Sequence, residues 1–299
     1  MGGQELPPAS SEVKLHFPAL FFIMIILTEY YESQNEQRRD EILHSIQANC
    51  NNPYIEKVVL FTDGFLYCDI LDTENGHKIE MHNIGRRLTY AEVFEYCNHF
   101  HRDKVCAVCN NDISFDKTIS LAQVEQGQFL CLTRWDIQED GTLIFKEPSN
   151  SRKYSQDAWI FKSPLPVKML QKSGFTFGRP GCDNMIAYLA VVSGMQVMNP
   201  SEIIKAKHLH LSQHRNYDLN ERGTPAKKEK IGKHCLYMNV CTTDSMVYNP
   251  DRLIYKLQQA WRPPETIWYG EDAIKKAQSM ETELEELWSK SLEIFQRDI

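Results

Sequence analysis

The chain has 299 residues, 42% of them hydrophobic, which is enough for one large domain or two modest ones with a substantial core. Its net charge of −7 gives no sign of the basic surface that nucleic-acid binding usually needs, so no nucleic-acid partner is expected. Nine cysteines without framework spacing, in a sequence with no secretory leader, indicate reduced thiols and a cytoplasmic protein.

The first strongly apolar segment, "FPALFFIMIIL" at 17–27, is read as a buried strand. It is eleven residues long, whereas a membrane-spanning helix needs about 20, so no transmembrane segment is expected. The segment lacks the preceding basic residues and the cleavage site of a signal peptide, and a polar run follows it directly. Its β-branched and aromatic residues favour a strand buried on both faces of a parallel sheet.

Strands and helices then alternate along the chain. Further strands are predicted at 54–64, 77–85, 103–109 and 128–136, and helices at 35–52, 88–100 and 117–126. In the second of these helices, Thr89 and Glu92 have the spacing of a capping box. The alternation predicts an α/β sheet, in which ligands bind at the carboxyl ends of the strands.

The later part of the chain is less regular. A helix closed by Gly194 is expected to begin at Asp183 or Asn184. The polar, turn-rich run 218–234 is read as a loop or linker, and 271–297 as a charged helix with an apolar stripe.

Polar residues stand where the predicted strands end. They are Thr28-Glu29-Tyr30, Asp63, Asn110-Asn111-Asp112 and Arg134-Trp135-Asp136. One such end is an ordinary turn, but several meeting at one edge of a sheet would form a site.

Signature motifs for dinucleotide, P-loop, hydrolase and zincin chemistry are missing. Cys106 and Cys109 resemble half a zinc site, but residues three apart on a strand face opposite sides and no second CxxC exists. They are interpreted as buried structural thiols.

Oxygen ligands for a hard cation are the remaining signal. Asn110 and Asp112 lie two apart on an extended chain, which suits Mg²⁺ or Mn²⁺. His208 and His210 share a face if their segment is extended, and would add nitrogen ligands. A turn at 110–112 and structural histidines explain the same residues without a metal. The adjacent arginines Arg86 and Arg87 would hold phosphate, or form a solvated face.

In chain order, "VVLFTDG", "RRLTYAEVFEYCN", "CNNDISFD", "CLTRWD", "SQDAWIFKSP", "GRPGCDN", "NPS" and "HLHLS" resemble a family of nucleotide-sugar glycosyltransferases of the GT-A fold. Those of large algal viruses, with related bacterial and algal domains, are the most similar. The resemblance spans 18–217, and "SQDAWIF" with "GCDN" is its most specific part. It implies a Rossmann-like, mixed but mainly parallel sheet flanked by helices. The expected division is an N-terminal extension (1–16), a GT-A domain (17–217) and a loop with a C-terminal helical extension (218–299).

The resemblance also implies roles for individual residues. It places Mn²⁺ or Mg²⁺ on Asp112, Asn110, His208 and His210, and a UDP- or GDP-sugar donor against Thr28, Tyr30, Asp63, Arg86, Arg87, Asn110, Asn111 and Asp112. It makes Asp157 and Asp183 the catalytic candidates and puts Arg134 and Asp136 on the side of a glycan or glycoconjugate acceptor. The neutral Asn110 departs from the family's usual acidic first position.

Two other functions compete with a glycosyltransferase. A nucleotidyltransferase that makes the sugar nucleotide would use a similar sheet, but it should carry a Gly-rich loop where this chain has "TEYYESQ". A non-catalytic sugar-nucleotide-binding module on a degenerate scaffold is favoured by Asn110 alone.

Overall fold

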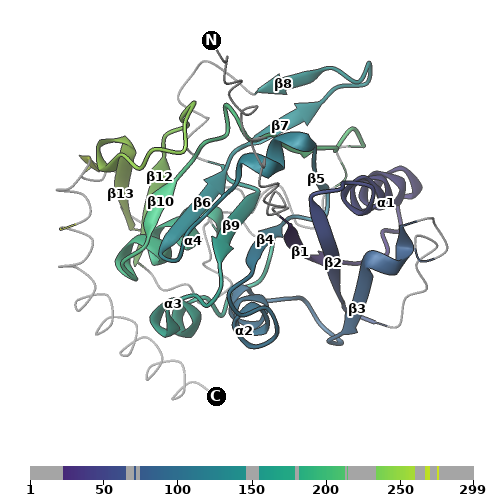
Figure 1. Cartoon of the computed structure of the whole chain (residues 1–299), viewed down its shortest axis with the longest axis horizontal. Coiled ribbons are helices and arrows are strands. Elements are labelled where there is room, and N and C mark those ends of the chain that lie inside the picture. The colour runs from purple at the N-terminus through teal and green to yellow at the C-terminus, as the bar shows by residue number, and fades with distance from the viewer. Residues whose placement is uncertain are drawn as a thin grey trace, which may run out of the picture.

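The computed structural model describes residues 23–64, 71, 75–145, 155–178, 182–212, 214, 234–259, 267–269 and 275. Within them, a central sheet lies between two layers, as the edge-on view of Figure 1 shows. The predicted 1–16 extension, the 218–233 part of the loop and most of the predicted helix at 271–297 lie outside the described residues.

The central sheet has seven strands in the order β10-β6-β9-β4-β1-β2-β3. Their bounds are β1 Met24–Tyr30, β2 Ile55–Thr62, β3 Ile79–Asn83, β4 Val105–Cys109, β6 Gln128–Leu132, β9 Ala158–Lys162 and β10 Gln196–Met198. All neighbouring pairs are parallel except the two that β9 makes with β4 and β6. The expected mixed, mainly parallel sheet flanked by helices is confirmed.

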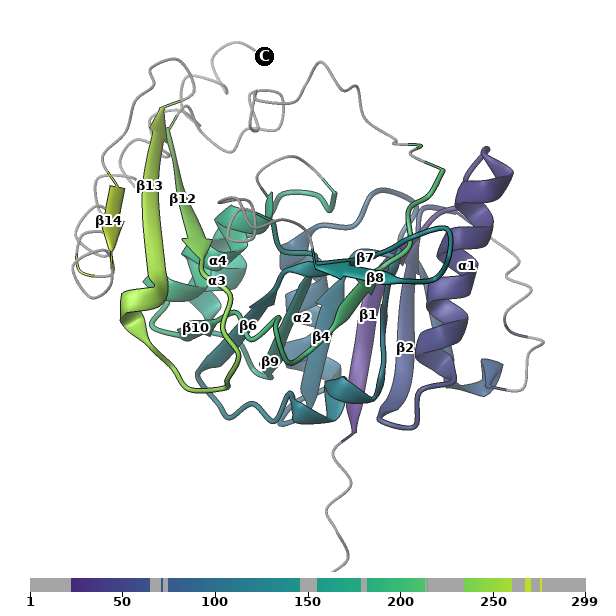
Figure 2. The same cartoon turned by 90° about the horizontal axis from the view of Figure 1, so that it is seen from above.

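The two faces of this sheet carry separate hydrophobic cores, because alternate residues of each strand point to opposite sides. On β1, Met24 and Ile26 pack with Ile42 and Ile46 of helix α1 (Glu36–Cys50). The opposite face packs on three helices, α2 Tyr90–Phe100, α3 Val167–Lys172 and α4 Cys182–Val192. Figures 1 and 2 show α1 on one side of the sheet and α2 and α3 on the other.

A second, four-stranded sheet crosses the carboxyl ends of the central strands. Its order is β5-β11-β7-β8, with β5 Ile113–Phe115, β11 Ala206–His208, β7 Arg134–Ile137 and β8 Leu143–Phe145. In Figure 2, β7 and β8 lie across the upper ends of the vertical central strands. The predicted strand 128–136 is therefore two strands, β6 and β7, and each belongs to a different sheet.

A third sheet is formed by strands that follow His214 in the described part of the chain. Its strands are β12 His234–Val240, β13 Leu253–Gln259 and β14 Ile267–Tyr269, paired antiparallel. The buried side chains of Met238, Val240 and Leu253 join the same core as α4, so this part of the chain packs on the face of the central sheet that α4 covers. These strands have no counterpart among the elements expected from the sequence.

Local signals explain most element ends. The capping box at Thr89 and Glu92 is present at the start of α2, and Asn35 caps α1 by accepting from the backbone N–H of Arg38. Gly194 follows α4 with φ of 86°, the left-handed conformation that ends helices. The helix expected at 117–126 is wrong in extent, because only a 3-10 turn at Lys117–Leu121 forms there, started by the Asp116 side chain. Within the described residues, further 3-10 turns form at Gly76–Lys78 and Pro250–Arg252.

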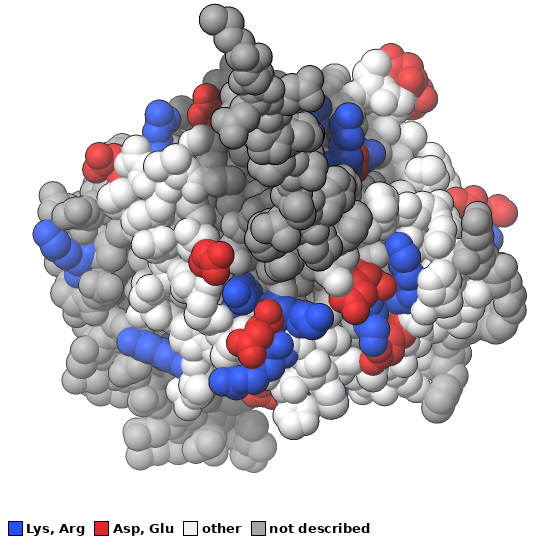
Figure 3. All heavy atoms as spheres, in the orientation of Figure 1, with Lys and Arg blue, Asp and Glu red and all other residues white. Residues whose placement is uncertain are grey.

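Among the described residues, no helix is both long and apolar enough to cross a membrane. On the face drawn in Figure 3, acidic and basic side chains lie intermixed below the grey region. Opposite charges that alternate in this way neutralise one another locally and create no broad field of one sign.

Candidate functional site

The topology brings the predicted site residues to one edge of the central sheet. Strands β1, β2 and β4 are parallel, and β9 pairs antiparallel with both β4 and β6, so β6 runs in the same direction as β4. The carboxyl ends of these four strands therefore meet at that edge. Strand β9 runs the other way, and its first residue Ala158 pairs with both Cys109 and Leu132 at the ends of their strands. Asp157, which precedes β9, therefore reaches the same edge as Asp112 in the turn after β4.

Strand register places His208 between two carboxylates. It pairs with Ile113, next to Asp112, on one side of β11, and with Asp136 on the other side. Its Nδ1 lies 2.7 Å from Asp136 Oδ1, and its Nε2 lies 3.2 Å from Asp112 Oδ2. Because a carboxylate oxygen only accepts, Asp136 holds the Nδ1 proton and thereby turns Nε2 toward Asp112.

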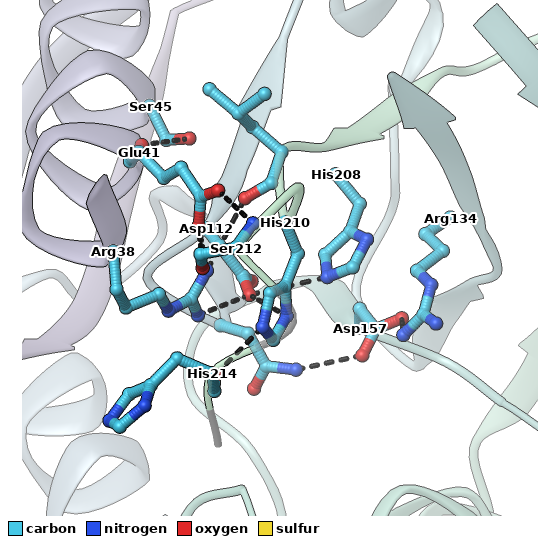
Figure 4. Close-up of polar contacts among 12 residues, drawn as sticks. Arg38, Glu41, Ser45, Asp112, Arg134, Asp157, His208, His210, Ser212 and His214 are labelled. Carbon is cyan, nitrogen blue, oxygen red and sulfur yellow. Dashed lines mark hydrogen bonds and ion pairs between the residues drawn. The ribbon is translucent and has the colours of Figure 1, made fainter. Parts of the chain in front are cut away.

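His210 completes a three-residue cluster. One ligand atom each from Asp112, His208 and His210 lies within 4.8 Å of the others, and Figure 4 shows the two rings beside the carboxylate. The Nε2 of His210 bonds the carbonyl oxygen of His214 at 2.8 Å, so Nε2 carries the proton. Its Nδ1 lone pair then faces Asp112 Oδ2 at 3.7 Å. A lone pair facing a carboxylate is an arrangement that a cation between them would stabilise.

The charges of this cluster are strongly perturbed. Burial alone would raise the pKa of Asp112, but His208 and Arg38 outweigh it and hold that pKa well below its usual range. Burial would lower the pKa of His208, yet the two carboxylates raise it to about 9. Burial, with the charge of Arg38, lowers the pKa of His210 to about 4. At neutral pH, the cluster therefore holds a carboxylate, an imidazolium and a neutral imidazole.

The residues present fit a divalent cation. Asp112 Oδ1 is buried and accepts no hydrogen bond from the part of the chain that the structure describes, although buried carboxylate oxygens normally accept one. Carboxylate oxygen with two imidazole nitrogens is a ligand set of first-row divalent metals, and a metal bound there would displace the Nε2 proton of His208. Asn110, expected as a fourth ligand, donates from its amide nitrogen to Asp157 Oδ1 at 2.8 Å.

Arg38 is part of this site, and sequence reasoning missed it. It is the third residue of α1, and its Nη2 lies 2.6 Å from Asp112 Oδ2 (Figure 4). Its Nη1 donates to Glu41 Oε2 at 3.2 Å and to the carbonyl oxygen of Leu209 at 3.3 Å. The Glu41 carboxylate also accepts from the backbone N–H and the hydroxyl of Ser212, at 2.6 and 2.8 Å. Helix α1 is thus bonded to both the Asp112 turn and the segment that carries His210.

A second ion pair lies beside the first cluster. Arg134 donates from Nη1 to Asp157 Oδ2 at 3.2 Å and from Nε to Asp136 Oδ1 at 3.0 Å. The charge of Asp157 raises the pKa of Arg134, against the effect of burial. Arg134 and Asp136, expected beside an acceptor, therefore support Asp157 and His208, and Asp157 is held as the partner of a buried arginine.

Asp183 has a different environment from every other acid in the site. It is the second residue of α4, and its Oδ2 accepts from the backbone N–H of Gln156 at 3.2 Å. Burial and the charge of Asp157 raise the pKa of Asp183 to about 7. A carboxyl group with a pKa near 7 can take up and release a proton at physiological pH.

The residues expected to bind the donor are less uniform. Thr28 and Tyr30 are buried at the end of β1, and the Thr28 hydroxyl donates to the carbonyl of Cys109 at 2.8 Å. Asn111 is half-buried in the turn, and Asp63 is exposed after β2. Thr28 thus joins two strand ends, and its hydroxyl proton is used by the Cys109 carbonyl.

The two adjacent arginines behave differently. Arg86 is exposed and pairs with Glu92 of α2. Arg87 donates from Nε to the buried Glu29 at 2.7 Å and from Nη2 to the carbonyl of Phe177 at 3.1 Å. Glu29 also accepts from the backbone N–H of Leu88, which fixes Arg87 at the end of β1. Of the two, Arg87 is therefore the one bonded to the end of β1.

No family model matches the chain, and no curated protein matches it. Among solved structures, the chain is similar to GalNAc-T7 with UDP, GalNAc and Mn²⁺ (TM-score 0.44, 9% identity, 66% of this chain and 45% of that one). It is similar to the mannosyltransferase PcManGT from Pyrobaculum calidifontis in complex with GDP-Man and Mn²⁺ (TM-score 0.42, 10% identity, 65% and 58%). A third is 4-diphosphocytidyl-2C-methyl-D-erythritol synthase from Anaerococcus prevotii (0.40, 14%, 67% and 92%). The match spans about half the length of the two transferases, and these similarities assign no activity to this chain.

Proposed function

We propose that the chain is a metal-dependent GT-A glycosyltransferase that moves a hexosyl or pentosyl group from a UDP- or GDP-sugar to a hydroxyl of a glycan or glycoconjugate. The observation that carries the proposal is the buried Asp112–His208–His210 cluster at the carboxyl edge of the central sheet. Such edges are where α/β sheets bind ligands. The resemblance in sequence to nucleotide-sugar glycosyltransferases falls on the same turn.

The metal in this proposal is held by Asp112, His208 and His210, and two imidazole ligands favour Mn²⁺ over Mg²⁺, which prefers oxygen. Bound there, the ion would stabilise the negative charge that develops on the leaving diphosphate. Asp136 keeps His208 in the orientation that presents Nε2. Arg87, fixed by Glu29, is proposed to add a bidentate donor for phosphate.

Asp183 is proposed as the general base. The acceptor hydroxyl attacks the anomeric carbon, the bond from that carbon to the diphosphate oxygen breaks, and the hydroxyl proton passes to Asp183. A pKa of about 7 suits this transfer, because the group is ionised often enough to accept a proton and basic enough to remove one. Asp157, tied to Arg134 and Asn110, is proposed to position the reacting groups.

A non-catalytic sugar-nucleotide-binding module is the second candidate, because the amide of Asn110 is committed to Asp157 and adds no charge to the metal cluster. A cytoplasmic location is proposed for either function, since Cys97, Cys106, Cys109 and Cys131 are buried thiols outside any disulfide.

The test is slow donor hydrolysis. The protein is incubated with Mn²⁺ and a panel of UDP- and GDP-sugars, and release of free nucleotide is measured. We expect release from one donor that stops on chelation and in Asp112→Asn. Asp116→Asn is the matched control, since Asp116 lies four residues away and caps the turn at Thr118. Donor binding without hydrolysis or transfer would support the binding module instead.

A further inference from the structure

The buried Arg38 forms an ion pair with Asp112, the carboxylate that is a metal ligand in the proposed function. The Arg38 side chain is 5% exposed, and its guanidinium makes an ion pair of 2.6 Å with Asp112 Oδ2. A carboxylate buried without a cation would be costly, so Arg38 together with His208 stabilises the charge of Asp112 when no metal is present.

Arg38 is also fixed in place. One nitrogen, Nη1, bonds both Glu41 Oε2 and the carbonyl of Leu209, while Nη2 bonds Asp112. Glu41 is itself held by two bonds from Ser212. The guanidinium cannot swing away without breaking these contacts, so it stays beside Asp112 whatever else that carboxylate binds. Figure 4 shows Arg38 reaching from α1 to the carboxylate on the side away from His208.

An ion bound to Asp112 would therefore have a positive guanidinium as a close neighbour. Like charges at such separations repel strongly in a site shielded from water. Glu41 offsets part of the Arg38 charge, but Asp112 is the one acid among the three candidate ligands, so the cluster itself does not balance an arginine and a divalent ion. A diphosphate carries that missing charge.

We propose that Arg38 is a resident counter-cation that keeps the affinity for free metal low and makes metal binding depend on the donor diphosphate. The inference rests on the proposed metal site and goes beyond it by naming the residue that couples the two ligands. In thermodynamic terms, Arg38 increases the coupling free energy between metal and nucleotide. Arg38 is a positioning residue in this account, because it acts through Asp112.

The test is a titration with Mn²⁺ monitored by calorimetry, in the presence and in the absence of UDP. In Arg38→Gln, we expect Mn²⁺ alone to bind at least ~10-fold more tightly than in the parent, and the enhancement by UDP to shrink by a similar factor. Arg39→Gln is the matched control. It removes the same charge from the same helix, but Arg39 is 38% exposed with ion contacts of 3.9 Å, and we expect no more than ~2-fold change.

Two more variants keep the result decisive. Arg38→Gln leaves Glu41 without its cation, so Arg38→Gln/Glu41→Gln, with unchanged net charge, is measured beside it and should show the same tightening. Arg38→Lys keeps a positive charge and should keep weak binding of Mn²⁺ alone. Unchanged or weaker Mn²⁺ binding in both glutamine variants would overturn the role of Arg38. A parent that binds no Mn²⁺ even with UDP would overturn the metal site itself, and with it the proposed function.

Discussion

The surroundings at the two ends of the site shift the pKa of a buried carboxylate in opposite directions. At one end, Asp112 is surrounded by Arg38, His208 and His210, and its pKa is held well below the usual range. At the other end, Asp183 has a backbone N–H and the like charge of Asp157 for neighbours, with no ion pair to a cation among the described residues, and its pKa rises to about 7. One environment keeps a permanent negative charge, and the other prepares a group for proton transfer. Pairs of acids separated in this way are how active sites assign different roles to one residue type.

The largest effect is expected from a substitution of Asp112. Asp112→Asn keeps the size of the side chain but removes the charge that Arg38 and His208 share. We expect Mn²⁺-dependent UDP binding to weaken by at least ~100-fold. Breaking the buried ion pair between Asp112 and Arg38, which keeps Glu41, should also lower the free energy of unfolding by about 3 kcal/mol.

Calorimetry and thermal melting check these two effects of Asp112→Asn, with Asp116→Asn as the control that should change neither. Binding of Mn²⁺ and UDP at the parent's affinity by a folded Asp112→Asn variant would place the metal elsewhere.

At the other end, Asp183→Asn should separate catalysis from binding. The amide cannot accept the hydroxyl proton, so we expect transfer to fall by at least ~100-fold. Binding of Mn²⁺ and UDP should remain within ~2-fold of the parent, because Asp183 is not among the ligand residues. Single-turnover transfer and calorimetry measure the two quantities. Parallel loss of transfer and of binding would contradict the separate roles of Asp183 and Asp112.

The pH dependence of stability provides a third comparison. Because folding raises the pKa of Asp183 from 3.8 to about 7, the folded chain binds this proton more tightly than the unfolded chain. The stabilisation is complete below about pH 4 and is lost as the pH rises through 7. Asp183→Asn, which stays neutral, should therefore gain on the order of 2–4 kcal/mol over the parent at pH 8 and nothing at pH 4.

Melting curves from pH 4 to 8 test this prediction. Asp157→Asn is the contrasting variant, since it takes the ionic partner from buried Arg134 and should destabilise the chain at pH 8. Equal shifts of the melting temperature for Asp183→Asn at pH 4 and pH 8 would contradict the raised pKa of Asp183 in the folded chain.

The smallest predicted effect concerns Asp136. Asp136→Asn still bonds His208 but no longer holds its Nδ1 proton with a full charge, so we expect Mn²⁺ affinity in the presence of UDP to fall about 10-fold. Co²⁺ substituted for Mn²⁺ reports the same change in its visible absorption, which depends on ligand geometry. An unaltered affinity and an unaltered spectrum would return Asp136 to the acceptor side, where the sequence resemblance put it.

Much of the fold followed from sequence patterns that act locally. The capping box at Thr89, the apolar stripe of α1 and the short buried strands are each encoded in a window of a few residues. The split of 128–136 into two strands was missed, because it depends on Asn199 and Ser201, which accept from the backbone N–H of Thr133 between the strands. The third sheet was missed as well.

The site could be predicted only in part. The spacing of His208 and His210 and the position of Asp112 indicated a metal cluster, and the structure brings these three together. Arg38 had one available signal: it stands four residues before Ile42, on the buried stripe of α1, where a charged residue needs a partner. Its partner lies 74 residues away, and pairing over such a distance is set by the topology. The likeness to enzymes of large algal viruses stays a prediction.

The central claim is that Asp112, His208 and His210 bind one divalent ion together with a nucleoside diphosphate. Crystals grown with Mn²⁺ and UDP, with diffraction recorded at the manganese absorption edge, test it most directly. We expect one strong anomalous peak bonded to an Asp112 oxygen, His208 Nε2, His210 Nδ1 and the diphosphate, with Arg38 still paired with Asp112. A diphosphate bound without a manganese peak at these residues, or manganese held by other side chains, would contradict it.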